Sequence, residues 1–130
     1  MQLDFIKASS YGSGTETSGV VKIEGLDVSS VKGKDILIME DIVDSGLTLS
    51  RICRLLKEEG GAASVKVCAL LDKRARRKVV FEADWVGFNC PDEFVVGYGI
   101  DFSEHWRFLP FVGVPKPEAV ERVRSEVNKL

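Results

Sequence analysis

The residues best suited to chemistry gather in one segment, 36–49, where acidic and hydroxyl side chains and a glycine follow an apolar run. They are Glu40, Asp41, Asp44, Ser45, Gly46 and Thr48. A turn of short side chains ahead of a helix can direct several backbone N–H groups at one anion, such as a phosphate. Two adjacent acids beside an anion require a ligand that also brings hydroxyls or a divalent cation. A sugar phosphate with Mg²⁺ brings both.

Regular elements on either side position this segment. Residues 36–39 are apolar without alternation, which indicates a strand covered on both faces in a parallel sheet. Ligands of open α/β sheets bind at the carboxyl ends of such strands. The apolar positions of the helix expected after the turn are Leu49, Ile52, Cys53 and Leu56, and Gly60 and Gly61 end it. For Ser45 alone, an ordinary helix N-cap is an equal alternative.

A basic run follows the next expected strand. Residues 64–71 form that strand, so strand, helix and strand give a right-handed parallel crossover. The densest basic stretch, 72–78, therefore leaves the sheet at the edge that presents Glu40 and Asp41. Cations there can face an anionic ligand, although most charge runs are only solvated loops. A further short strand is expected at 83–88.

The two ends of the chain carry weaker signals. A strand at 3–8 leads into the Gly-rich segment 9–19, which suits either a mobile lid or a loop without a role, and a short strand returns at 20–23. Two glycines in the run 94–101 would weaken a strand and mark close approach of a ligand or a second backbone. A valine stripe indicates a last short helix.

Composition limits the possible partners and location. The 130 residues suit one domain, and the net charge of −2 excludes a general attraction to nucleic acids or membranes. No membrane span or signal peptide is expected, which favours a cytoplasmic protein. Cys53, Cys68 and Cys90 lack metal-ligand spacing and are expected to be reduced thiols. Neither the Walker pattern nor Gly-x-Gly-x-x-Gly occurs in the sequence.

The stretch from residue 40 to 49 resembles the phosphoribosyl pyrophosphate (PRPP) motif of type I phosphoribosyltransferases, in the form carried by hypoxanthine-guanine phosphoribosyltransferases. Asp44 is the informative position, because relatives that use uracil, adenine or orotate usually carry another residue there. The resemblance implies an α/β fold with a parallel sheet flanked by helices. It also implies transfer of the 5-phosphoribosyl group from PRPP to hypoxanthine or guanine, with Mg²⁺, giving IMP or GMP and pyrophosphate.

The resemblance also implies a role for each matched residue. The 5'-phosphate and ribose of PRPP would be held by Glu40, Asp41, Asp44, Ser45, Gly46, Leu47 and Thr48, with Asp44 also the general base or proton relay at N7 of the base. The purine would be bound by Lys73 and by a purine-binding segment, 91–107, which contributes Phe94 and Val95. Pyrophosphate and the closing loop would involve Ser10, Tyr11, Arg77 and Arg107. Magnesium would be held by Glu40 and Asp41, and Asp101 would help to hold a second Mg²⁺. A homodimer or homotetramer is the implied assembly.

The chain matches only part of that family. Its members carry several tens of residues ahead of the position matching Leu3, including a strand that ends in a Leu-Lys-Gly-type pyrophosphate loop, and a chain without that strand should show unpaired sheet edges and exposed apolar faces. Three interpretations follow. The chain is a truncated or mis-started transferase, it pairs its edge with another subunit and keeps weak activity, or it binds nucleotide or PRPP as a regulatory module without turnover.

Overall fold

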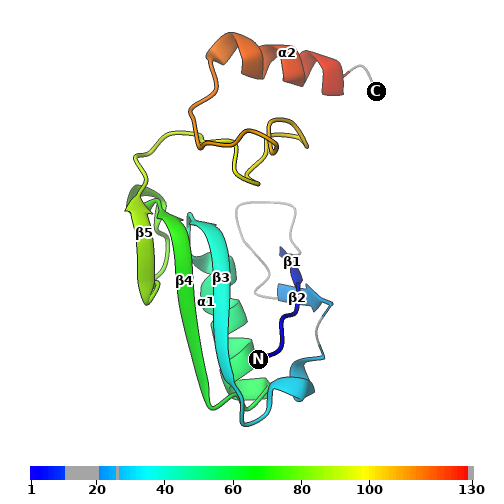
Figure 1. Cartoon of the computed structure of the whole chain (residues 1–130), viewed down its shortest axis with the longest axis vertical. Helices are drawn as coiled ribbons and strands as arrows, with labels where there is room; N and C mark the ends of the chain where they lie inside the picture. The colour runs from blue at the N-terminus through cyan, green and yellow to red at the C-terminus, as the bar shows by residue number, and fades with distance from the viewer. Residues whose placement is uncertain (11–20, 26, 129–130) are drawn as a thin grey trace. The chain divides into compact units, whose positions relative to one another are not determined.

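The computed structural model describes residues 1–10, 21–25 and 27–128. Tyr11 and most of the expected lid at 9–19 therefore lie outside the described residues. Contacts divide the chain into two compact units, Met1–Asn89 and Cys90–Leu130, which are considered separately (Figure 1).

A parallel three-stranded sheet forms the centre of the first unit. Its strands are β3 (Asp35–Val43), β4 (Ser64–Asp72) and β5 (Trp85–Asn89), in the order β3-β4-β5. β3 and β4 run parallel with Ile38 opposite Val67, and β4 and β5 run parallel with Cys68 opposite Trp85. The strands expected at 64–71 and 83–88 are confirmed, with ends displaced by one or two residues, and the parallel crossover is confirmed with them.

Helix α1 (Leu47–Arg54) continues as a π-helical turn, Leu55–Glu59, up to Gly60. The expected apolar stripe is confirmed, because Leu49, Ile52 and Leu56 are buried. Val31, Ile52, Leu56 and Ala62 form a core cluster against which Ile36 and Ile38 of β3 pack. Figure 1 shows α1 lying against one side of this sheet.

The expectation that β3 is covered on both faces is wrong for the described structure. Its side chains alternate in exposure, and Leu37 and Met39 are 56% and 69% exposed. They remain exposed because α1 packs against the opposite face, on Ile36 and Ile38. Trp85 continues the same exposed face, since Met39, Cys68 and Trp85 lie in one row across the sheet. An exposed apolar face was expected for a chain that matches only part of the family.

A separate two-stranded sheet precedes β3. β1 (Lys7–Ser10) pairs antiparallel with β2 (Val21–Glu24), and a 3-10 helix at Val28–Val31 follows. The strand expected from residue 3 thus begins later, at Lys7. Ile6 and Ala8 pack against the same core cluster as β3 does, so hydrophobic burial ties this hairpin to the first unit.

Turns dominate the second unit up to α2 (Pro117–Val127), which confirms the expected last helix and buries Val123. In the run 94–101 the backbone turns at Gly97, whose φ is 98°. A Cβ atom at Gly97 would lie 2.0 Å from the carbonyl oxygen of Phe111, so this glycine allows close approach of a second backbone. In the part of the chain that is described, no helix is long and apolar enough to cross a membrane. All three cysteines are free thiols, as expected.

Candidate functional site

Two neighbouring carboxylates mark the carboxyl half of β3. The strand continues to Val43, so Glu40 and Asp41 lie within it and not beyond its end. Glu40 is half-buried and Asp41 is exposed. The Asp41 N–H donates to Glu40 Oε1 at 3.2 Å, and the Ile42 N–H donates to Asp41 Oδ1 at 2.7 Å. These bonds hold both side chains close to the backbone at the strand edge.

Burial raises the pKa of Glu40 to about 7, with further contributions from a hydrogen bond to Asp41 and from the negative charge of Asp41. Without a ligand, the Glu40 carboxyl group is thus partly protonated at neutral pH. A cation, or hydroxyl groups that donate hydrogen bonds, would favour the fully ionised pair. The pair is therefore suited to a ligand of that kind.

The turn after β3 has the geometry of an anion-binding loop. Gly46 is the N-cap residue of α1 and adopts a left-handed conformation with φ 78°, so Ser45 is not the cap. Ser45 Oγ instead accepts a hydrogen bond from the Leu47 N–H at 3.3 Å. Within the described chain, no protein acceptor takes the N–H of Ser45 or Gly46. These groups and the free N–H groups of the first helical turn are available to an anion.

Backbone hydrogen bonds join this turn to the loop that follows β4. The Lys73 N–H donates to Val43 O and the Lys78 N–H donates to Ser45 O, both at 2.9 Å. Lys73 itself is only 5% exposed. The basic run therefore lies directly beside the acidic strand end, as the parallel crossover predicts.

Asp72, the last residue of β4, is a buried carboxylate that sequence reasoning did not single out. Its Oδ2 atom accepts from Arg74 Nε at 3.0 Å, and its Oδ1 atom accepts from Arg77. Arg77 also donates from Nη1 to the carbonyl oxygen of Asp44 at 2.6 Å. The sequence feature that could have pointed to Asp72 is its position at the end of an apolar strand, just before several arginines. A run of charged residues does not by itself show which of its side chains is buried.

Two of the residues predicted to bind the purine, Phe94 and Val95, belong to the second unit. Phe94 is 49% exposed and packs edge-to-face on Phe102, with ring centroids 5.4 Å apart. Val95 is buried, and among the described residues its backbone N–H and carbonyl make no hydrogen bond. Those two groups are therefore available to a base edge, and Phe94 offers an aromatic ring.

Asp101 and Arg107 pair with each other. Arg107 Nη2 lies 3.2 Å from Asp101 Oδ1 and 3.0 Å from Glu104 Oε1, and Asp101 also accepts the Glu104 N–H at 2.7 Å.

Across the described ranges, no group of three or more His, Cys, Asp or Glu side chains could hold a metal ion. Glu40 and Asp41 alone nevertheless fit Mg²⁺, which is commonly bound through one or two carboxylates together with substrate phosphates.

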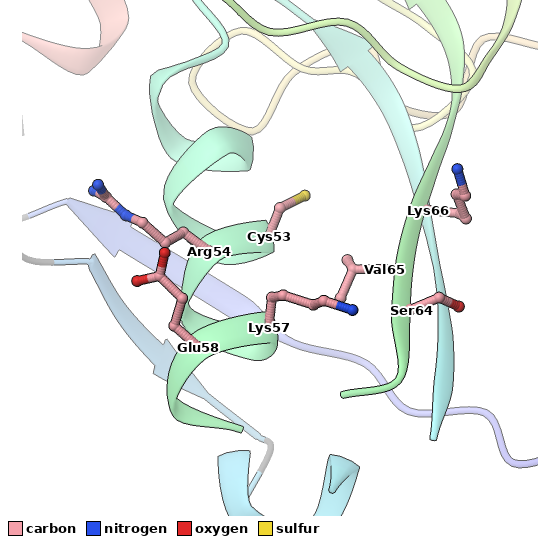
Figure 2. A pocket seen from close by; sticks show the side chains of 7 residues that line it. All are labelled: Cys53, Arg54, Lys57, Glu58, Ser64, Val65 and Lys66. Atoms are coloured by element: carbon pink, nitrogen blue, oxygen red, sulfur yellow. The ribbon is translucent and has the colours of Figure 1, made fainter. Parts of the chain in front are cut away.

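A cavity of about 550 Å³ lies away from this site, between α1 with its π-helical turn and the amino end of β4. In Figure 2 the side chains of Cys53 and Lys57 point toward the strand. The two lysines that line the cavity already have partners, because Lys57 donates to the Ala63 carbonyl oxygen and Lys66 forms an ion pair with Asp84. Burial raises the pKa of the Cys53 thiol, which keeps it protonated. The cavity therefore offers no evident chemistry.

Comparisons with known proteins agree with this geometry. Residues 1–103 match the phosphoribosyl transferase domain family. The chain is 52% identical over 122 residues to the hypoxanthine-guanine phosphoribosyltransferase of Bacillus subtilis, covering 93% of this chain and 67% of that protein. It is 54% identical over 118 residues to the bifunctional protein TilS/HprT of Listeria innocua, covering 91% of this chain and 18% of that protein.

Solved structures give the same result. A hypoxanthine phosphoribosyltransferase from Staphylococcus aureus superimposes with a TM-score of 0.81 at 48% identity, covering 89% of this chain and 62% of that one. The hypoxanthine phosphoribosyl transferase of Trypanosoma cruzi gives 0.85 at 40% identity, covering 95% and 63%. The chain thus spans about two thirds or less of the length of these relatives.

Proposed function

The chain belongs to the phosphoribosyl transferase family, and on this basis we propose that it transfers the 5-phosphoribosyl group of PRPP to hypoxanthine or guanine, releasing pyrophosphate. One observation carries the proposal. The Lys73 N–H donates to the Val43 carbonyl at 2.9 Å, so a loop built for a sugar phosphate adjoins a lysine that can read a base. The proposal includes a cytoplasmic location and a homodimer or homotetramer.

The ribose phosphate half of PRPP is assigned to the end of β3 and the following turn. The N–H groups and hydroxyls of residues 44–48 bind the 5'-phosphate, helped by the positive end of α1. Glu40 and Asp41 bind the ribose hydroxyls, directly or through Mg²⁺. When bound, Mg²⁺ offsets negative charge on the leaving pyrophosphate. Asp101, in the second unit, is proposed to help hold a second Mg²⁺.

Each residue proposed to contact the base is considered within its own unit. The Lys73 ammonium donates to the 6-oxo group, which favours oxopurines over adenine because an amino group cannot accept in that position. Phe94 offers an exposed ring for stacking, and Val95 offers free backbone groups for the purine edge. Asp44 accepts the proton from N7 of the base as the bond to ribose forms.

The pyrophosphate half of PRPP has fewer candidates. Arg107 is proposed to contact pyrophosphate, because its side chain is 49% exposed and its ion pairs with Asp101 and Glu104 can be exchanged for an anion. Ser10 and Tyr11 are proposed to belong to the closing loop that excludes water. Arg77 was expected at the same place, but its guanidinium is engaged by Asp72 and by the Asp44 carbonyl. We therefore assign Arg77 to the support of the turn rather than to pyrophosphate.

Turnover with a panel of bases tests this function. The purified chain, PRPP and Mg²⁺ would be incubated with equal concentrations of hypoxanthine, guanine, adenine and uracil, and the nucleotides separated by chromatography. IMP and GMP are the expected products. Formation of AMP or UMP at comparable rates would contradict the assignment of Lys73 and Asp44.

The alternative is a module that binds PRPP or nucleotide without turnover. It requires only the anion-binding turn after β3 and the two neighbouring carboxylates, which this chain contains. Calorimetric titration separates the two functions. Binding of GMP or PRPP without product in the base panel would support the module, and product formation would exclude it.

A further inference from the structure

Asp72 occupies an unusual place in the molecule. It is 2% exposed, and among the described residues only Asp72 and Lys73 are charged and buried. Burying a carboxylate costs several kcal/mol unless charged partners compensate it. Two arginines provide that compensation, one on each oxygen. Asp72 is thus a buried charge that is costly to fold, and it directly precedes Lys73, the lysine proposed to contact the base.

The two arginines differ in what else they contact. The Arg74 side chain is 61% exposed, and its other partner is the exposed Glu82 at 3.1 Å. The Arg77 side chain is 15% exposed and reaches the Asp44 carbonyl from Nη1 at 2.6 Å. Of these two arginines, Arg77 is therefore the one that connects Asp72 to the phosphate turn.

The Arg77 side chain also packs against that turn. Its Cδ atom would lie 3.0 Å from a Cβ atom at Gly46. A hydrogen bond to the Asp44 carbonyl and packing on Gly46 together limit how far the turn can move. A charge-assisted bond from a buried, planar guanidinium holds a carbonyl more firmly than water would.

We propose that Asp72 is a positioning residue, which acts through Arg77 to hold the 44–46 turn in its phosphate-binding conformation. Asp72 does not touch the ligand itself. The expected effect on PRPP binding rests on the proposed function. The hydrogen-bonded bridge from Asp72 through Arg77 to the Asp44 carbonyl is present in the protein without ligand. The two parts can therefore be tested separately.

Amide hydrogen exchange tests the bridge without any ligand. The probes are the N–H groups of Leu47, Lys73 and Lys78, which are bonded to Ser45 Oγ, Val43 O and Ser45 O. Asp72→Asn and Arg77→Gln should each speed their exchange roughly tenfold. Arg74→Gln is the matched control, because it removes the other partner of Asp72, and should leave exchange within about twofold. Equal acceleration in the control would overturn the proposal.

Steady-state kinetics test the consequence for function. Asp72→Asn, Arg77→Gln and the double variant should raise the KM for PRPP by a similar factor, roughly tenfold, because both residues act through one bridge. The KM for hypoxanthine should change little. A general loss of folding would lower the amount of active protein and would not raise the KM for PRPP alone. Losses that multiply in the double variant would overturn the proposal. If the unmodified chain shows no turnover, the proposed function fails while the exchange experiment still decides the bridge.

A second pair of variants covers the case in which Asp72→Asn does not fold. Arg77→Lys keeps the charge but loses the two-sided geometry of the guanidinium, and Arg74→Lys makes the same change in the exposed partner. Faster exchange in Arg77→Lys alone supports the bridge. The same exchange rates in both lysine variants would overturn it.

Discussion

The Lys73 N–H donates a hydrogen bond to the carbonyl oxygen of Val43 at 2.9 Å. This bond joins the ends of two adjacent parallel strands, β3 and β4. On one side of it lies a turn with free N–H groups, and on the other a buried lysine. The backbone of the sheet therefore fixes where the Lys73 side chain starts relative to the proposed sugar-phosphate turn.

Replacing Asp44 tests the proton transfer. Asp44→Asn keeps the size of the side chain but removes the base, so kcat should fall about 10²–10⁴-fold while PRPP affinity changes far less. Stopped assays give kcat, and calorimetry gives the affinity. Unchanged turnover in the variant would remove Asp44 from the chemistry.

Replacing Lys73 tests base selection. Lys73→Met removes the ammonium group and should raise the KM for hypoxanthine about 10- to 100-fold, since a hydrogen bond from a charged donor is lost. The KM for PRPP should remain nearly unchanged. Lys78→Met, at an exposed position in the same loop, is the control. A similar effect of both variants on hypoxanthine would show that only the charge of the loop matters.

Gly46 and Gly33 form a matched pair for the phosphate turn. Both have positive φ, 78° and 70°, but a Cβ atom would meet Arg77 and Phe81 at 3.0 and 3.2 Å only at Gly46. Each alanine variant should lose about 1–2 kcal/mol of unfolding free energy from the backbone conformation. Gly46→Ala should lose about 1 kcal/mol more from crowding. Urea titrations measure the loss of unfolding free energy in both variants. Equal losses would show that the turn at Gly46 shifts to accommodate the added methyl group without cost.

Asp84 predicts a pH dependence of stability. Hydrogen bonds from Lys66 Nζ at 2.8 Å and the Val67 N–H at 2.9 Å lower the pKa of Asp84 below its usual 3.8. A carboxylate with a lowered pKa stabilises the fold above its unfolded pKa, and this contribution disappears as the pH falls through the folded pKa. Asp84→Asn should therefore lower Tm at pH 7, and the difference should shrink below about pH 4. A difference that persists at pH 2 would contradict this explanation.

Local sequence patterns predicted much of this fold. The spacing of Leu49, Ile52 and Leu56 gave α1, and the run at 64–71 gave β4, because apolar periodicity directly reflects one buried face. The parallel crossover then placed Lys73 beside the turn. The acidic turn and its glycine were also found from sequence, since only a few residue types suit a left-handed position ahead of a helix.

Other features depend on contacts that no local pattern contains. The apolar run of β3 indicated burial on both sides, yet Leu37 and Met39 are exposed because packing depends on which elements surround the strand. Asp72 looked like one charge among many, and only the three-dimensional contacts show it between Arg74 and Arg77. Arg77 was predicted to lie near pyrophosphate, and its partners, Asp72 and the Asp44 carbonyl, could not be read from spacing.

The central claim is most directly tested by pyrophosphate release from PRPP by the purified chain with Mg²⁺, measured with and without hypoxanthine. The proposed function predicts release that requires hypoxanthine and forms one IMP for each pyrophosphate. No release under these conditions, with PRPP still bound, would contradict the transferase and favour a binding module.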